Sequence, residues 1–249
     1  MVLENNFIRS IRIDSVKITE PYLRALPAIG AIIRQGGLAF HRPVTFLVGE
    51  NGSGKSTLLE AIAVAAGFNA EGGTRNFNFS TRATHSQLYE ALSTVRGRYP
   101  KDGFFLRAES FYNVASNIDE LDLRGSYGGL SLHEQSHGES FLALIRNRFS
   151  GSGLYLLDEP EAALSVSRLM TLLVEMQRLV NSASQLIVAT HSPILLAYPQ
   201  AEILELSSRG IHPVEYRQTE PYRLTHTFLE NPERMLHYLL EEQEGVDDA

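Results

Sequence analysis

The fold of this chain is decided by the stretch Gly49-Glu50-Asn51-Gly52-Ser53-Gly54-Lys55-Ser56-Thr57 and by the segments that flank it. The apolar run Val44-Thr45-Phe46-Leu47-Val48 comes directly before it and predicts a buried strand, and residues 55–66 predict a helix. Glycines let the backbone curl so that successive amides face one anion, and the amino end of the helix adds its positive dipole. A strand, a turn of pattern G-x-x-x-x-G-K-[ST] and a helix together predict a loop that binds nucleotide phosphates.

Each part of this loop has an expected role in binding ATP and Mg²⁺. Lys55 places a cation between the β- and γ-phosphates, and the Ser56 hydroxyl is an expected ligand for Mg²⁺. The other residues expected to line the nucleotide are Gly49, Asn51, Gly52, Ser53, Gly54 and Thr57. A chance glycine-rich turn is the alternative, and the matching flanks on both sides disfavour it. Kinases, GTPases, helicases and transport ATPases share such a loop, so the remaining residues must decide among them.

Length and composition are those of a globular protein. The 249 residues are 43% hydrophobic and 20% charged, which suffices for a substantial core, and the absence of cysteine excludes disulfides and thiolate metal sites. We find no signal-peptide pattern and no apolar run near the roughly 20 residues of a membrane helix, so we expect a cytoplasmic location. The net charge of -7 argues against a globally basic nucleic-acid-binding protein, and the acidic tail, about 241–249, is expected to be solvated.

Beyond the loop, apolar segments alternate with segments of helical composition. Strands are predicted at 7–18, 44–48, 104–106, 154–157, 185–190 and 202–206, and helices at 55–66, 86–96, 136–149, 166–180 and 228–242. This alternation predicts an α/β fold of the P-loop NTPase type, with a mainly parallel sheet flanked by helices. We expect residues 1–249 to form a single domain.

Two carboxylates end the predicted strand at 154–157. Side chains at the carboxyl end of a parallel strand point into the ligand crevice. Asp158 is therefore expected to hold the Mg²⁺ ion, and Glu159 is expected to act as the general base that polarises the attacking water. A charged turn without function is the alternative, which the phosphate loop elsewhere in the chain disfavours.

Two further stations carry polar groups that suit a phosphate. His191 ends the predicted strand at 185–190, where it is expected to sense the γ-phosphate, although a lone histidine is more often structural. Ser136-His137-Gly138-Glu139 opens a predicted helix. Its S-x-x-E spacing is that of a capping box, and its hydroxyl and free amides also suit a second anion site. The two interpretations are compatible, because a cap leaves other amides free.

These four segments, in their order along the chain, resemble the motifs of the ATP-binding-cassette (ABC) class of P-loop ATPases. Gly49–Thr57 resembles the Walker A motif, Leu154–Glu159 the Walker B motif, Ser136–Glu139 the signature motif, and His191 the switch histidine. Glu-Asn-Gly-Ser-Gly-Lys-Ser-Thr and Asp-Glu-Pro-Glu-Ala-Ala-Leu are similar to the soluble branch with the chromosome-maintenance and OLD-like ATPases. Residues 104–110 and 132–139 resemble a family of short, stand-alone AAA-family ATPases.

The resemblance implies both a fold and a mechanism. It implies an antiparallel β portion from the N-terminal region, about 1–48, beside the parallel sheet. It also implies an ATP-dependent homodimer in which Ser136, His137, Gly138 and Glu139 of one copy contact the ATP held by Lys55 of the other. ATP hydrolysis would then dissolve the interface.

Several positions depart from the class pattern. The signature has Ser-His-Gly-Glu in place of Ser-Gly-Gly-Gln, so His137 adds bulk beside the phosphate. Residues 163–165 lack the aspartate that usually follows Walker B. No glutamine follows 104–106, and Glu109 is the nearest candidate for that position. Phe40 and Tyr22 are the options for an aromatic residue that stacks on adenine.

Three functions fit these motifs to different degrees. The first is an ATP-dependent clamp or switch in DNA-related or defence processes, with a nucleic acid or another protein as partner. Arg75 lies where chromosome-type ATPases carry a loop arginine, although a solvated loop explains it equally well. The second is the ATP-binding subunit of a membrane transporter, for which 110–135 is a short docking segment. A small-molecule kinase is the third, and the Asp158–Glu159 pair fits attack by water better.

Overall fold

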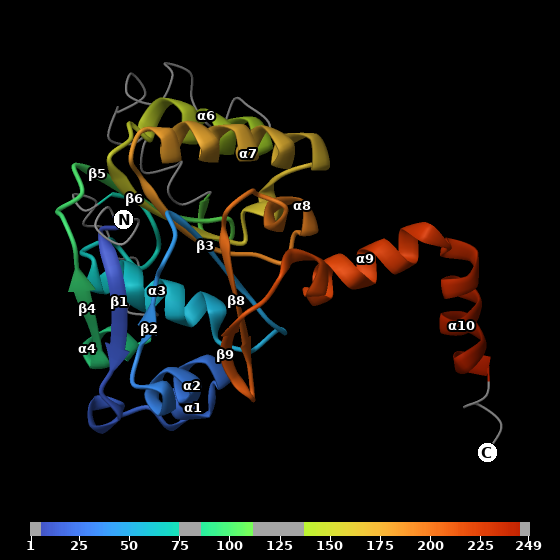
Figure 1. Cartoon of the computed structure of the whole chain (residues 1–249), viewed down its shortest axis with the longest axis horizontal. Coiled ribbons are helices and arrows are strands. Elements are labelled where there is room, and N and C mark those ends of the chain that lie inside the picture. The colour runs from blue at the N-terminus through green and yellow to red at the C-terminus, as the bar shows by residue number, and fades with distance from the viewer. Residues whose placement is uncertain (1–5, 75–85, 112–136, 245–249) are drawn as a thin grey trace.

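The computed structural model describes residues 6–74, 86–111 and 137–244, which form two β-sheets and the helices packed on them (Figure 1). The larger sheet has six strands in the order β5-β6-β7-β3-β8-β9. All neighbouring pairs are parallel except β8 with β9, which is antiparallel at one edge. Its strands are β3 (Val44–Val48), β5 (Asp102–Arg107), β6 (Gly153–Asp158), β7 (Gln185–Ala189), β8 (Glu202–Ser207) and β9 (Gly210–Pro213). The predicted α/β fold with a mainly parallel sheet is therefore confirmed.

Helices cover both faces of this sheet, which explains why its strands are apolar without alternation. Leu154 and Leu156 of β6 pack in one core cluster with α3 (Lys55–Ala65). Tyr155 and Leu157 point the other way, into a second cluster with α6 (His137–Arg148) and α7 (Val166–Asn181). Figure 1 shows α6 and α7 on one side of the sheet and α3 on the other, with α1 (Pro21–Ala25) and α2 (Pro27–Gln35) beyond α3.

The smaller sheet is antiparallel, with the order β2-β1-β4, and confirms the expected antiparallel portion. Its strands are β1 (Ile8–Ile13), β2 (Leu38–Ala39) and β4 (Leu92–Arg96). Residues 1–48 alone do not make up this sheet, because β4 comes from later in the chain and β3 lies in the larger sheet.

The prediction of one helix over 86–96 was wrong. Only α4 (Leu88–Ala91) is helical, and β4 follows it at once. Leu92 pairs with Ile13, and Thr94 pairs with Ile11, so the segment completes a sheet along β1. The β-branched residues Thr94 and Val95 suit this strand, and long-range pairing overrode the helical pattern.

The C-terminal helix predicted at 228–242 is in fact the end of one helix and most of another. The chain forms α9 (Glu220–Glu230) and α10 (Pro232–Glu244), and Asn231 between them is not helical, with φ -151° and ψ 76°. Pro232 has no amide hydrogen and disfavours helical geometry in the residue before it, so the break falls at this position. The Asn231 side chain accepts a hydrogen bond from the Arg234 amide at 3.0 Å and thereby caps α10.

One buried side chain ties the two sheets together. The Gln185 side-chain oxygen, at the start of β7, accepts hydrogen bonds from the amides of Phe7 and Ile8, both at 2.9 Å. Its side-chain nitrogen donates to the Ile8 carbonyl at 2.9 Å. The Gln185 side chain thus makes the hydrogen bonds with Phe7 and Ile8 that the backbone of a neighbouring strand would otherwise make.

We expect Gln185→Met to lower the free energy of unfolding by about 2–4 kcal/mol, because it leaves two buried amides without acceptors. Urea unfolding followed by circular dichroism measures this loss. Gln218→Met, at an exposed position, is the matched control and should change stability by less than about 0.5 kcal/mol. A loss below about 1 kcal/mol for Gln185→Met would contradict a linking role for this side chain.

Candidate active site

The phosphate loop lies between β3 and α3, as predicted. Gly49, Gly52 and Gly54 all have positive φ, of 149°, 77° and 96°. Gly49 also passes so close to β8 that an added Cβ would lie 2.3 Å from the Leu206 carbonyl oxygen. Only glycine fits at this position, for both its backbone angle and its lack of a side chain.

Lys55 lies folded over this loop and is almost fully buried, at 4% exposure. Its Nζ donates to the Gly49 and Glu50 carbonyls at 2.8 and 2.9 Å. Burial lowers the pKa of the ammonium, while the nearby carboxylates of Glu159, Asp158 and Glu161 oppose that shift. A buried cation is thereby held where the loop amides converge.

Asp158 ends β6 beside the phosphate loop and accepts a hydrogen bond from the Ser56 hydroxyl at 2.9 Å. Burial raises the pKa of this carboxyl to about 6, and Arg107 and the Ser56 hydrogen bond act in the opposite direction. A hydroxyl and a carboxylate are hard oxygen ligands that suit Mg²⁺, which fills its other positions with water and phosphate oxygens. The two expected metal ligands therefore lie together and fit that ion.

Arg107 is a member of this site that sequence analysis missed. Its Nε lies 3.4 Å from Asp158 Oδ2, and its Nη1 donates to Glu60 Oε2 at 2.8 Å. Arg107 ends β5, and the parallel register places it opposite Asp158. The sequence did place Arg107 directly after a predicted strand. It did not show that this strand is paired with the one that ends in Asp158, and only that pairing brings Arg107 into the site.

Glu159 follows Asp158 in a left-handed conformation, with φ 48° and ψ 51°. Such backbone costs about 1–3 kcal/mol for a residue with a side chain. Ser152, Ala183 and Gln200 also have positive φ, but of these four residues only Glu159 lines the site. Its amide donates to the Ala189 carbonyl of β7 at 2.9 Å, which holds the turn in place. A cavity of about 210 Å³ adjoins it, lined by Ser56, Arg107, Ala108, Glu109, Asp158, Glu159 and Ala162.

His191 lies just beyond β7, the strand between β6 and β3. Burial and the Lys55 charge lower the pKa of its imidazole, so the ring is neutral at pH 7. Its Nε2 is buried and has no hydrogen-bond partner among the described residues. Glu161, a second residue that sequence analysis missed, accepts hydrogen bonds from the His191 amide and the Thr190 hydroxyl and so joins this turn to the one after β6.

The signature segment is described only in part. Ser136 lies outside the described residues, and His137 is described only as the first residue of α6. Gly138 packs so closely that an added Cβ would lie 3.0 Å from the Ala163 carbonyl oxygen. Glu139 forms an ion pair with Arg168 at 3.0 Å. The start of α6 therefore packs against the segment that follows Glu159 on the same chain.

The remaining candidates have different outcomes. Glu109 is 89% exposed and lies 3.7 Å from Arg107, at the rim of the 210 Å³ cavity. Arg75 lies outside the described residues. Phe40 is fully buried in the core, so it cannot stack on adenine, and that option was wrong. Tyr22 is 54% exposed.

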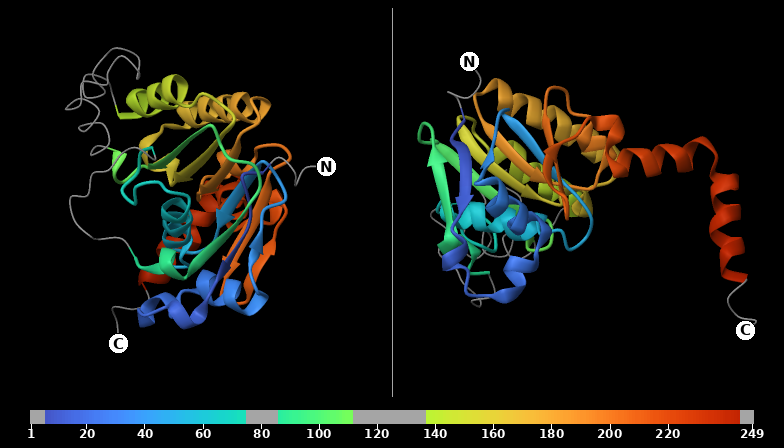
Figure 2. Two further views of the ribbon diagram at one scale, coloured as in Figure 1. Left: turned by 90° about the vertical axis from the view of Figure 1, so that its left-hand side faces the viewer. Right: turned by 60° about the horizontal axis from the view of Figure 1, so that its bottom comes forward.

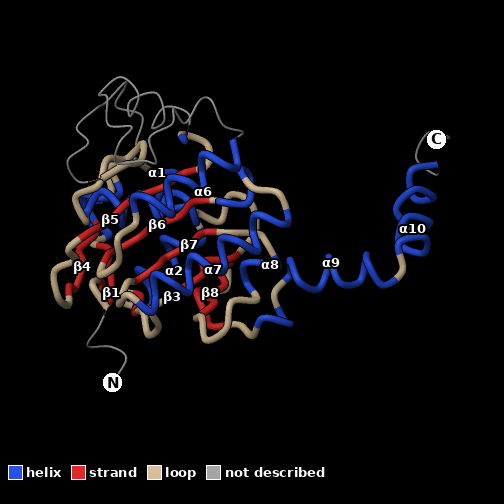
Figure 3. Tube along the Cα trace, turned by 90° about the horizontal axis from the view of Figure 1, so that it is seen from above, coloured by secondary structure: helices blue, strands red, loops and turns tan. Residues whose placement is uncertain are grey.

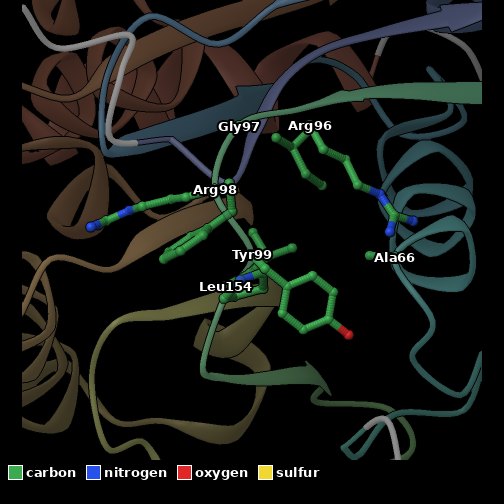
Figure 4. Close-up of a pocket in the computed structure, with 9 residues that line it drawn as sticks. Ala66, Arg96, Gly97, Arg98, Tyr99 and Leu154 are labelled. Atoms are coloured by element: carbon green, nitrogen blue, oxygen red, sulfur yellow. The ribbon is translucent and has the colours of Figure 1, made fainter.

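A second cavity, of about 140 Å³, lies at the opposite end of the sheet, where β6 begins (Figure 4). Arg96 donates to the Ala65 carbonyl at 2.8 Å and Arg98 to the Ala183 carbonyl at 3.0 Å. Figure 4 shows the two guanidinium groups pointing in opposite directions. Both arginines donate to backbone carbonyls of the protein. None of the residues that line this cavity belongs to the phosphate loop, so the cavity is a separate feature.

Arg107→Met removes the cation beside Asp158 and should destabilise the protein in a pH-dependent way. The raised pKa of Asp158 means that the native state loses stability as the pH rises from about 4 to about 6. Without Arg107 that pKa is higher still, so the loss extends above pH 6. We expect a cost of about 3 kcal/mol at pH 8 and clearly less at pH 5, measured by urea unfolding with a chelator present.

The matched control is Arg34→Met, which removes an exposed arginine and should be nearly neutral at both pH values. An equal cost for Arg107→Met at pH 5 and pH 8 would show that the guanidinium does not act through Asp158.

Two family models together match residues 29–197 of the chain. One, described as "AAA domain", matches residues 29–102, and the other, described as "AAA domain, putative AbiEii toxin, Type IV TA system", matches residues 97–197. Among the described residues, no helix combines the length and the apolar character needed to cross a membrane.

Curated relatives and a solved structure agree with these models. The galactose/methyl galactoside import ATP-binding protein MglA of Mannheimia succiniciproducens is 27% identical over 191 residues, which are 68% of this chain and 37% of that protein. Structural maintenance of chromosomes protein 6 of Takifugu rubripes is 31% identical over 101 residues, 41% of this chain and 9% of that protein. The fold superposes on cbiO1 of Clostridium perfringens with a TM-score of 0.51 at 16% identity, covering 95% of this chain and 99% of that one.

The chain spans less than two fifths of the length of these curated relatives. The matched residues nevertheless include the phosphate loop and the ends of β6 and β7, where the site lies. The chain contains a P-loop ATPase domain of the AAA type, and it is similar to the ATP-binding proteins of the ABC class.

Proposed function

We propose that this ATPase acts as a switch in which two copies close on two ATP molecules and separate after hydrolysis. The observation that carries this proposal is the position of Glu159. It lies beside the phosphate loop, in strained backbone, on the same cavity as Ser56 and Asp158. A base next to the phosphate site is what attack by water requires.

The phosphate loop would hold ATP through amides and one cation. In this proposal the loop Gly49–Thr57 cradles the β- and γ-phosphates, and Lys55 moves its ammonium from the loop carbonyls to the phosphate oxygens. Ser56 and Asp158 would hold a Mg²⁺ ion, which would neutralise charge on the phosphates when bound. Asp158 would hold it as the carboxylate.

Hydrolysis would then depend on Glu159 and His191. Glu159 takes a proton from water as the water oxygen forms a bond to the γ-phosphorus. The bond between that phosphorus and the β–γ bridging oxygen breaks, and ADP leaves. The buried Nε2 of the neutral His191 ring supplies a hydrogen bond to the γ-phosphate, which would satisfy an atom that has no partner among the described residues.

The second half of each site would come from the other copy. Ser136, His137, Gly138 and Glu139 would contact the γ-phosphate across the interface, as the class resemblance implies. In this proposal the two sheets and the helices packed on them form one ABC-type domain. This domain works as half of a symmetric pair. The partner on which the switch acts is another protein or a nucleic acid, with Arg75 as the candidate contact.

A second candidate function has support from the comparisons. MglA is by its printed name an import ATP-binding protein, so this chain could supply ATP turnover to a membrane transporter. A transporter subunit needs a membrane protein as its partner, whereas the proposed switch needs only a second copy of this chain. Dimer formation by the isolated Glu159→Gln protein with ATP is therefore the outcome that the switch requires.

We expect Glu159→Gln to bind ATP with little change and to lower turnover at least about a hundredfold, because the amide cannot accept the proton. ATP should then accumulate in a stable dimer. Light scattering after size-exclusion chromatography, with and without ATP, measures the dimer fraction at low protein concentration.

Lys55→Ala is the control that removes nucleotide binding, so it should show no response to ATP in the same measurement. At a concentration where the nucleotide-free protein is monomeric, an ATP-bound Glu159→Gln protein whose mass does not change with nucleotide would contradict the proposed closure. Unchanged ATP affinity in Lys55→Ala would contradict the assignment of the phosphate loop.

A further inference from the structure

The C-terminal helices form an arm that leaves the body of the molecule. Figures 1 and 2 show α9 and α10 extending away from the sheets, with a bend between them. No residue of α9 is buried. Its base is held by Tyr222, whose ring lies 4.7 Å from that of Tyr216, and by contacts with α8 (Pro193–Leu196).

This arm carries an apolar face that the described residues of the same copy leave exposed. On α10, Met235, Leu236, Leu239 and Leu240 recur at helical spacing, and the three leucines are 43–62% exposed. Leu224 and Phe228 lie four residues apart on α9, at 55% and 37% exposure. Helices of 11 and 13 residues are marginal in water without packing, so this face predicts a partner.

The body carries a matching apolar stripe on α7. Val166, Met170 and Val174 follow one another at intervals of four residues and are 60%, 56% and 67% exposed. This row forms a ridge of the kind that packs into the groove between two rows of a second helix. On α10, the rows Met235–Leu239 and Leu236–Leu240 border such a groove.

The two helix pairs carry net charges of opposite sign. The arm, α9 with α10, has six glutamates and two arginines. The helix pair α6 and α7 has four arginines and two glutamates, and its arginines form ion pairs within the chain, with Glu139, Glu175 and Asp102. An acidic arm is unsuited to anionic membrane surfaces and to nucleic acid, both of which select basic helices.

We infer that the arm of one copy docks on the α7 stripe of a second copy, which makes the chain self-associate without nucleotide. In a symmetric pair this contact occurs twice, and each copy supplies one arm and one stripe. Figure 3 shows how far α10 lies from the helices of its own body. The contact is independent of the proposed ATP-dependent closure.

The absence of cysteine allows a direct test by oxidative cross-linking of full-length single-cysteine variants, mixed without nucleotide. Met170→Cys mixed with Leu239→Cys should give a covalent dimer. Arg234→Cys, on the face of α10 away from Leu236 and Leu239, and Ser93→Cys, on the smaller sheet, are matched controls that should not cross-link with Met170→Cys.

A second measurement uses sedimentation of nucleotide-free protein over a range of concentrations. Leu236→Glu with Leu239→Glu should raise the dissociation constant of the dimer at least about tenfold, because each leucine loses its burial. Met170→Glu should have a similar effect and Arg234→Gln, on the opposite face of α10, little. Circular dichroism confirms that the variants remain folded.

Three outcomes would overturn the inference: a nucleotide-free monomer at all concentrations, cross-links only between two Leu239→Cys copies, or cross-links that ignore the face of α10. Glu159→Gln combined with the two arm substitutions separates the two proposals. If that protein still dimerises with ATP, the proposed closure stands, whatever the arm does.

Discussion

Parallel hydrogen bonding among β6, β7 and β3 is the constraint on which the rest of this structure depends. Ala189 of β7 is opposite Asp158 on one side and Leu47 on the other. Three chain segments therefore end at one edge of the sheet, and they deliver the phosphate loop, the acidic pair and His191 to one place. A slip of a single residue in either pairing would separate Ser56 from Asp158 and remove the site.

Helices cover both faces of the sheet, so an unpaired charge at this edge would cost free energy. Lys55 and Asp158 are buried and Arg107 is partly buried, so each charge needs an opposite charge or a hydrogen bond. Ser56 and Arg107 satisfy Asp158, and loop carbonyls satisfy Lys55. The site is therefore organised before a nucleotide arrives, and binding exchanges internal partners for phosphate oxygens and a metal ion.

The body and the arm follow different physical rules. The sheets and their helices bury their apolar residues within one chain, and Gln185 joins the two sheets through buried hydrogen bonds. The arm has the same amphipathic pattern as a core helix but no core to join. The apolar residues of such helices are buried by contact with another molecule. The inferred role of the C-terminal helices is therefore self-association and not catalysis.

The sequence alone determined the strand–loop–helix around Lys55, the acids after β6 and the histidine after β7, because these depend on local spacing and on apolar runs. Tertiary structure decided what depends on distant partners. Residues 92–96 form a strand because β1 offers hydrogen bonds, and Arg107 joins the site because β5 lies beside β6. No local pattern states which strand is the neighbour, since that choice is made by the packing of the whole sheet.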